Sequence, residues 1–144
     1  MPDHWIIPCN IKHFDVREHF RKTDTVVWRN SFSIHEGDTV YIYVGAPVSE
    51  LLFQCKAVST CVSSDVLEAN SYAVTAKKAN NYYSKKEKYI ILQKEVQFPD
   101  GCFPLAEMRE NGLGQVQIQA RTDRRLQRYI DSKMSEMDQN RRAD

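Results

Sequence analysis

The chain has 144 residues, of which 42% are hydrophobic, 10% aromatic and 27% charged, and its formal net charge is +1. This length is typical of a single domain, and the composition is that of a globular protein, which excludes disordered and collagen-like classes. No apolar run approaches the roughly 18 residues that span a bilayer, and the first residues lack the basic start of a secretory signal. We therefore expect a soluble cytoplasmic protein without a membrane partner.

The cysteines and histidines show no pattern of a metal site. The cysteines are Cys9, Cys55, Cys61 and Cys102, and none forms a Cys-x-x-Cys pair. The histidines also lack a paired ligand spacing. Because cytoplasmic thiols are kept reduced, we expect free cysteines, no metal and no cofactor.

The N-terminal part predicts two strands separated by a short helix. Residues 5–7 are an apolar run, which predicts a buried strand, and Pro8 marks its end or a sheet edge because proline cannot donate to a ladder. Asp15 can cap a helix of about two turns, with Glu18 reaching back to the cap. Residues 25–28 are β-branched and then aromatic, which predicts a short strand.

Two alternating segments follow a turn at residues 37–38. Residues 39–44 alternate between aliphatic side chains on one face and tyrosines on the other, and residues 45–47 end this strand. Residues 51–62 alternate in the same way. Neighbouring strands joined by a short connection are usually antiparallel partners.

The C-terminal part predicts another strand, two helices and a last short strand. Residues 63–87 favour a loop with room for one helical piece, residues 88–96 a strand, and residues 98–101 a turn. A short helix is expected from Pro104 to before Gly112, followed by a strand over 114–119. The final helix is expected to be capped by Thr122 and to dock on the sheet through apolar residues 126–137.

Together these elements predict one domain over residues 1–137, with five or six mostly antiparallel strands in a compact α+β barrel-like fold. Residues 138–144 are polar, and we expect them to fray as a C-terminal tail.

Positive charge gathers in the second half of the chain. Residues 77–94 contain six lysines and one acidic residue, which favours contacts with phosphates; a solvated lysine-rich loop is the alternative. The lysines proposed to bind phosphate are Lys77, Lys78, Lys85 and Lys86. Arg121, Arg124 and Arg125 could also bind phosphates, or could be the solvated start of the final helix.

No catalytic motif is present in the sequence. It has no Gly-x-Ser-x-Gly elbow and no glycine-rich phosphate loop. A dyad of Cys9 and His13 is disfavoured because Cys9 ends an apolar strand. These features favour a binding module over an enzyme.

Several segments carry a resemblance to a known family. Residues 5–10 (WIIPCN), 27–29 (VWR), 37–44 (GDTVYIYV), 88–92 (KYIIL) and 105–113 (LAEMRENGL) have the order and spacing seen in EVE domains of the PUA-like superfamily, which are related to YTH and PUA domains. The resemblance covers residues 4–130. It implies an α+β PUA-like pseudo-barrel of five to six mostly antiparallel strands, with short surrounding helices and a C-terminal helix.

The resemblance also implies a non-enzymatic module that reads a modified base of DNA or RNA in an aromatic-lined pocket. By position, Asn10 would lie at the pocket mouth, Trp28 would stack on the base, and Arg29 to Ser31 would supply hydrogen bonds. Tyr43 or its neighbour Tyr41 could add a ring or pack under a helix. Asn10 could instead be a turn residue and Trp28 a core residue. Aromatic and amide side chains suit this task, because stacking one base on an aromatic ring stabilises a complex by about 1 to 3 kcal/mol.

Other functions remain open at this point. An accessory domain or small enzyme could bind a nucleotide or small aromatic ligand in the same pocket, and the C-terminal helix could serve a protein-interaction module. The sequence leaves open the choice of DNA or RNA, the modified base and the oligomeric state, with a monomer favoured.

Overall fold

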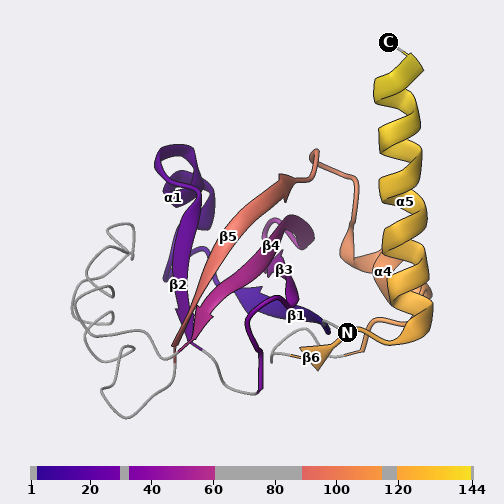
Figure 1. The fold of residues 1–144 in the computed structure, drawn as a ribbon. Coiled ribbons are helices and arrows are strands. Elements are labelled where there is room, and N and C mark those ends of the chain that lie inside the picture. The colour runs from indigo at the N-terminus through magenta and orange to yellow at the C-terminus, as the bar shows by residue number, and fades with distance from the viewer. Residues whose placement is uncertain (1–2, 30–32, 61–88, 115–119, 144) are drawn as a thin grey trace.

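A computed structural model describes residues 3–29, 33–60, 89–114 and 120–143 (Figure 1). The elements in chain order are β1 (His4–Cys9), α1 (Val16–Lys22), β2 (Thr25–Arg29), β3 (Thr39–Val44), β4 (Glu50–Thr60), β5 (Tyr89–Gln97), α4 (Leu105–Glu110), β6 (Ala120–Arg121) and α5 (Arg124–Ala143). The expected loop over 63–87 and most of the expected strand over 114–119 lie outside the described residues.

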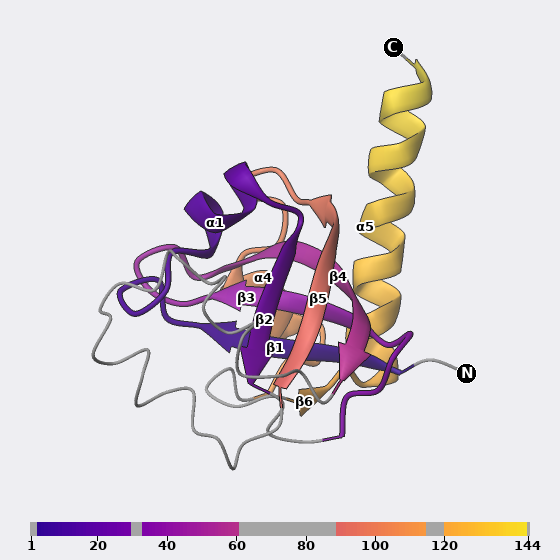
Figure 2. The ribbon, with the colours of Figure 1, turned by 60° about the vertical axis from the view of Figure 1, so that its left-hand side comes forward.

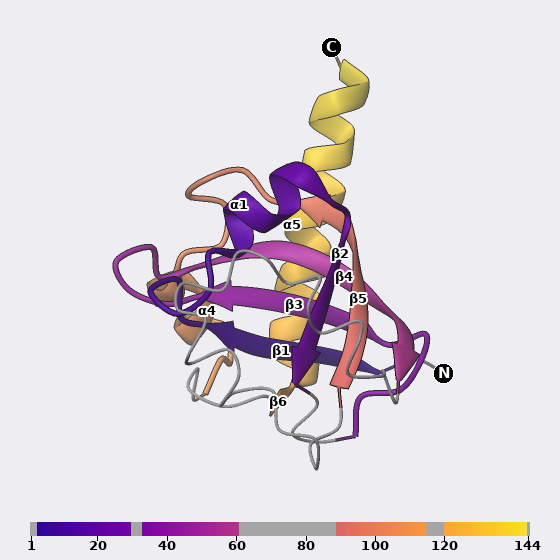
Figure 3. The same cartoon turned by 90° about the vertical axis from the view of Figure 1, so that its left-hand side faces the viewer.

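The strands form one six-stranded sheet in the order β2-β5-β4-β3-β1-β6. β1 and β3 are parallel, and the other neighbouring pairs are antiparallel. The sheet curls, so that β2 crosses over β3 and β1 at a steep angle (Figures 2 and 3). This confirms the α+β pseudo-barrel architecture expected from the sequence.

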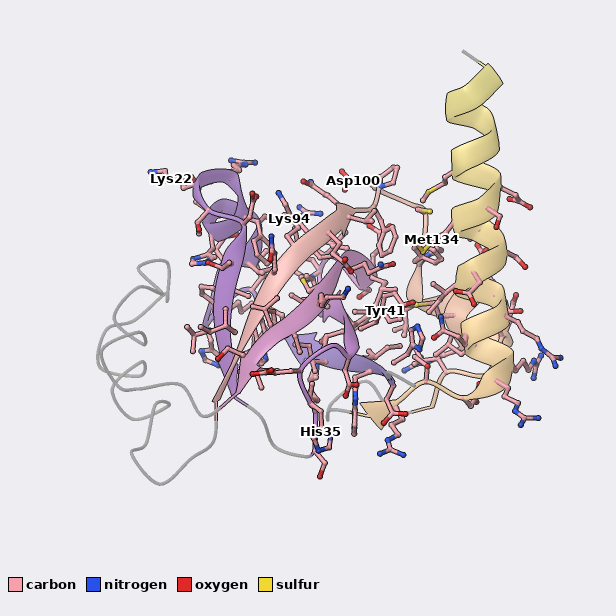
Figure 4. All side chains as sticks on the ribbon, in the orientation of Figure 1. Lys22, His35, Tyr41, Lys94, Asp100 and Met134 are labelled. Atoms are coloured by element: carbon pink, nitrogen blue, oxygen red, sulfur yellow. The ribbon has the colours of Figure 1, made fainter. Side chains whose placement is uncertain are left out.

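The curl separates two cores, one on each face of the sheet. The inner core, inside the curl, consists of Trp5, Ile7, Cys9, Val16, Phe20, Val26, Trp28, Ile34, Val40, Ile42, Val44, Leu52, Phe53, Cys55, Ala57, Ile90 and Leu92. The outer core, beneath α4 and α5, consists of Ile6, Tyr41, Tyr43, Leu51, Phe98, Phe103, Met108, Leu126 and Ile130. In Figure 4, Tyr41 lies between the sheet and α5.

Strand alternation determines which core each side chain joins. In β3 the aliphatic residues Val40, Ile42 and Val44 enter the inner core, and the tyrosines enter the outer core, as the alternating sequence predicts. A register shift between Ile42 and Tyr43 leaves Leu52 as an extra residue of β4. This irregularity lets two adjacent residues of β4, Leu52 and Phe53, both enter the inner core.

Pro8 lies within β1 rather than at its end. β3 pairs along the whole of β1, whereas β6 pairs only with Trp5 and Ile6. Within the described residues, Pro8 therefore lies where β1 has a single partner strand, the position in which a missing N–H group is tolerated.

The start of α1 follows the sequence prediction with one difference. The Asp15 carboxylate accepts a hydrogen bond from the Glu18 N–H group at 3.1 Å, so Asp15 is the N-cap. The Glu18 carboxylate does not reach back, because it forms an ion pair with Arg21 at 2.8 Å. The helix buries Val16, His19 and Phe20.

The C-terminal helix starts with a different cap from the one expected. The Asp123 carboxylate accepts the Leu126 N–H group at 2.7 Å, whereas the Thr122 hydroxyl donates to the Gln127 side-chain oxygen at 2.8 Å. Aspartate and threonine are both good caps, so sequence alone does not separate adjacent candidates. The helix docks on the outer core, as expected, and continues to Ala143, into the segment expected to be a tail.

The last part of α5 extends beyond the sheet in all three ribbon views (Figures 1 to 3). Among helices in the described part of the chain, none has both the length and the apolar character that a membrane span needs.

Candidate nucleic-acid interface

Partly buried residues border the inner core where β1 and β3 end. These parallel strands finish side by side at Cys9 and Val44, and the N–H group of Gly45 donates to the Cys9 carbonyl at 3.0 Å. Three partly buried apolar residues that follow the strand ends pack against the inner core there. We call these residues the rim: Ile11, Phe14 and Val48.

Asn10 shapes the turn that carries most of the rim. Its carbonyl oxygen accepts the N–H groups of His13 (2.9 Å) and Phe14 (3.0 Å), and its side-chain oxygen accepts the Lys12 N–H group at 3.0 Å. Asn10 is exposed and is therefore a turn residue at the edge of the rim. This position is compatible with its predicted place at a pocket mouth.

Trp28 lies beneath the rim, in the inner core. Its side chain is only 6% exposed, and the ring of Phe14 packs against it edge-on, with centroids 5.7 Å apart. The structure thus brings Trp28 and the Asn10 turn together through Phe14. Trp28 is nevertheless covered, so a base could stack on its ring only after Phe14 moves. Although polar residues follow Trp28 in the sequence, the Trp28 ring itself is buried.

Tyr43 lies on the other face of the sheet. It is 3% exposed and belongs to the outer core, as does Tyr41. Because side chains of a strand alternate between faces, Tyr43 points away from the side that holds Trp28. The structure does not bring these two predicted base-binding rings together; both tyrosines pack beneath the helices.

Other predicted site residues fall largely outside the described part of the structure. Arg29 is the last residue of β2 and pairs with Tyr89, but its side chain is not described. Ser31 lies outside the described residues, as do the predicted phosphate ligands Lys77, Lys78, Lys85 and Lys86. Their roles stay predictions.

The three predicted phosphate-binding arginines lie at the opposite end of β1 from the rim. The Arg121 guanidinium lies 5.0 Å from the centroid of the Trp5 ring and 3.3 Å from the Asp3 carboxylate. Arg125 donates to the Glu110 carbonyl, and Arg124 is exposed at the first position of α5. Roughly 16 Å of strand separates the two ends of β1.

The buried carboxylate of Asp38 holds together the segments at the arginine-bearing end of β1. Asp38, 4% exposed, accepts hydrogen bonds from the Trp5 indole N–H (3.0 Å) and from the N–H groups of Asp3 (3.0 Å) and His35 (2.9 Å). Burial acts to raise the pKa of Asp38, but these hydrogen bonds outweigh it and hold the pKa below its ordinary value. Trp5 is therefore a structural residue. The sequence predicted only a turn at Asp38 and missed its buried role.

Cys9 is a poor nucleophile in this setting. Burial raises the pKa of its thiol to about 12, and the nearby charge of Asp15 acts in the same direction. The thiol lies 3.4 Å from the Phe14 carbonyl as a hydrogen-bond donor. Cys9 is therefore protonated at neutral pH. In the part of the chain that the structure describes, no cluster of three or more His, Cys, Asp or Glu residues could hold a metal ion.

Sequence reasoning missed the rim itself. Ile11 and Phe14 are three residues apart and belong to one hydrogen-bonded turn, so they face the same side. This spacing was a usable signal. No local spacing indicates Val48. This residue follows β3, and it comes near Ile11 and Phe14 because β3 pairs with β1.

Comparison with known proteins identifies the fold. No family model matches the chain, and no curated protein matches it significantly. Among solved structures, an ASCH protein from Zymomonas mobilis is 11% identical and covers 90% of this chain and 94% of its own, with a TM-score of 0.66. A mutant of that protein gives 14% identity, coverage of 92% and 98%, and a TM-score of 0.67. A hypothetical protein from Leishmania major is 14% identical and covers 96% of this chain and 98% of its own, with a TM-score of 0.61.

These likenesses show the fold alone. The chain has the PUA-like pseudo-barrel fold in the form found in ASCH domains. The expected PUA-like fold is thus confirmed, whereas the resemblance to EVE domains stays a prediction.

Proposed function

We propose that this chain is a non-enzymatic domain that binds DNA or RNA and reads one modified base at the rim. The observation that carries the proposal is the partly exposed apolar rim directly above Trp28, at the shared end of two parallel strands. Flat apolar surface beside polar groups is the combination that binds an unstacked base.

The aromatic rings at the rim suit insertion of a base. The Phe14 and Trp28 rings lie with their centroids 5.7 Å apart and 64° between the ring planes, so a base inserted between them would contact the indole on one side and the Phe14 ring on the other. Stacking contributes about 1 to 3 kcal/mol per base, and extruding a base from a strand costs a few kcal/mol. Stacking therefore roughly offsets extrusion, and the preference for a modified base must come from polar groups such as the Asn10 amide.

Two further features support the proposal. EVE domains, which several segments of this sequence resemble, are readers of modified bases. The protonated Cys9 thiol beside the rim favours binding over covalent catalysis.

Phosphate contacts would add affinity without sequence preference. The predicted lysines and the arginines near the start of β1 are the proposed contacts. Neutralising Lys77, Lys78, Lys85 and Lys86 together should flatten the dependence of affinity on salt and weaken modified and unmodified strands alike. An unchanged salt slope would place the strand elsewhere, with Arg121, Arg124 and Arg125 the next residues to test.

A binding screen tests the proposal directly. Short DNA and RNA strands that differ in one modified base would be titrated at fixed salt against the wild type, Phe14→Leu and the control Tyr43→Leu. We expect one modification to bind best, and Phe14→Leu to weaken that strand about fivefold or more, the low end of the stacking range. Tyr43→Leu should keep the preference, because Tyr43 lies on the far face of the sheet.

Two results would count against the proposal. One is equal affinity for modified and unmodified strands. The other is an unchanged preference in Phe14→Leu. Free nucleosides that bind as tightly as strands would instead favour the alternative of a pocket for a nucleotide or small aromatic ligand.

A further inference from the structure

We infer that Lys12 and His13 form a phosphate subsite for the same nucleotide whose base is read at the rim. The inference rests on the proposed function and deepens it. It assigns the ligand class as a modified nucleoside that carries its own phosphate, and it assigns two contacts that no motif in the sequence indicates.

The turn places the Phe14 ring and the polar side chains of Lys12 and His13 on opposite sides. Two N–H groups converge on the Asn10 carbonyl, so residues 10–14 form one helical turn. In such a turn, Ile11 and Phe14 face one side and the two residues between them face the other. Accordingly Ile11 and Phe14 pack on the inner core, and Lys12 and His13 are exposed. A base held by Phe14 would have its phosphate on the solvent side, within reach of these two side chains.

These polar side chains are available, unlike two lysines elsewhere in the fold. Lys94 is held by the Phe20 carbonyl (3.3 Å) and the Asp24 carboxylate (3.7 Å), and Lys133 is paired with Glu107 at 2.7 Å. Among the described residues, neither the Lys12 ammonium nor the His13 ring has a hydrogen-bond or ion-pair partner. Available donors on a rigid turn are the type of group that binds a phosphate.

The neighbouring acidic groups are already engaged. The Asp15 carboxylate caps α1 by accepting the Glu18 N–H group, and the Glu18 carboxylate is paired with Arg21. The Asp100 carboxylate is paired with Arg17 at 3.4 Å. The two ion pairs cancel the charges of Glu18 and Asp100, whereas the capping Asp15 keeps its charge. The subsite would therefore bind a phosphate through the Lys12 and His13 donors rather than through a local excess of positive charge.

The test compares three ligands that share the preferred modified base: the nucleoside, its monophosphate and a short strand containing it. The variant is Lys12→Ala combined with His13→Ala, and the matched control is Lys56→Ala combined with His35→Ala, which removes an exposed lysine and an exposed histidine elsewhere. Lys12→Arg with native His13 is the charge-preserving variant. Thermal melting checks that each variant is folded.

We expect the wild type to bind the monophosphate at least fivefold more tightly than the nucleoside. The double variant should bind both equally, with its nucleoside affinity unchanged, and the control and Lys12→Arg should keep the difference. For the strand, the double variant should lower the slope of log affinity against log salt by about 0.7, the value for one phosphate of a single strand.

The outcomes separate this inference from the proposed function. If the double variant keeps the wild-type preference for the monophosphate, the subsite is refuted, while base reading at Phe14 stands. If Phe14→Leu leaves nucleoside binding unchanged, or if none of the three ligands binds the wild type, the proposed function fails and this inference fails with it. Equal loss in the matched control would assign the effect to overall charge and would also refute the subsite.

Discussion

The inner and outer cores are both rich in aromatic rings, but their rings are held in different ways. In the outer core, the Tyr41 hydroxyl accepts a hydrogen bond from Gln127 at 3.0 Å, and the adjacent Tyr129 hydroxyl donates to Glu107 at 2.6 Å. In the inner core, the Trp5 indole is hydrogen-bonded to Asp38 at the end far from the rim. The phenylalanine rings of the inner core and the rim have no such bond and pack edge-on against other rings, as Phe20 does against Phe53, with centroids 4.8 Å apart, and Phe14 against Trp28.

This difference indicates which side can open to a ligand. Exposing a hydrogen-bonded ring also breaks its polar contacts, and a partner left buried without a bond costs about 1 to 3 kcal/mol. Moving the Phe14 side chain breaks edge-on ring contacts with Trp28 and His19 and its packing on the inner core, but no hydrogen bond, because a phenyl ring carries no polar group. Aromatic content alone therefore does not identify a binding site; the way each ring is held does. The predictions below test this contrast, from the largest effect on stability to the smallest.

Trp28→Ala should produce the largest loss. The side chain is buried in the inner core, so its removal leaves a cavity, and we expect the free energy of unfolding to fall by about 3 to 5 kcal/mol. Urea denaturation of the wild type and the variant measures this change. A loss below about 1 kcal/mol would mean that the ring is not part of the core. Trp28→Phe, which keeps an apolar ring, should lose less and is the better variant for binding studies.

Asp38→Asn should have an intermediate effect and change the response to acid. Hydrogen bonds to a charged group contribute about 1.5 to 3 kcal/mol, and Asp38 accepts them from Trp5, Asp3 and His35. Because the pKa of Asp38 is lowered in the folded state, its contribution is present above its unfolded pKa of about 3.9. This contribution is lost as the pH falls through the lower folded value.

Unfolding curves measured from about pH 6 to pH 2 test this pH dependence. The wild type should lose stability on acidification, and Asp38→Asn should lose less over the same range. Asp100→Asn is the control, because the Asp100 side chain is 85% exposed in its pair with Arg17. Equal acid responses of wild type and Asp38→Asn would contradict the assignment.

Tyr129→Phe should have the smallest effect. It removes the hydroxyl that donates to Glu107 but keeps the ring against Phe103, so we expect a loss of about 0.5 to 1.5 kcal/mol. The Glu107 carboxylate keeps its ion pair with Lys133. Calorimetric melting measures the stability change. Oligonucleotide binding should be unchanged, and a large loss of binding would place the site on the outer side.

The sequence predicted best where a pattern is local. The alternation in residues 39–44 placed the aliphatic and tyrosine side chains on the correct faces, because the period of a strand is two residues. The Asp15 cap of α1 was also predicted correctly because it lies within one turn of the helix, whereas the predicted return contact of Glu18 was wrong. The cap of α5 was misassigned by one residue because Thr122 and Asp123 are both suitable caps.

The parts that the sequence did not predict depend on contacts between distant segments. The covering of Trp28 requires the turn that follows β1, which carries Phe14, to pack against β2. Tyr43 could be excluded from the same pocket only once β3 was placed between the two cores. The buried role of Asp38 arises from residues 33 and 35 positions away along the chain. Such pairings follow from the curl of the whole sheet and leave no local pattern.

The most direct test of the proposed site uses the two tryptophans of the chain as internal probes. Their indole N–H signals in a 15N-labelled sample can be assigned with Trp5→Phe and Trp28→Phe, and then followed during titration with the preferred modified strand and its unmodified counterpart. The account predicts that the Trp28 signal moves with the modified strand but not with the unmodified one, and that Trp5 responds alike to both. A Trp28 signal that keeps its free position when the modified strand is saturating would contradict base reading at the rim.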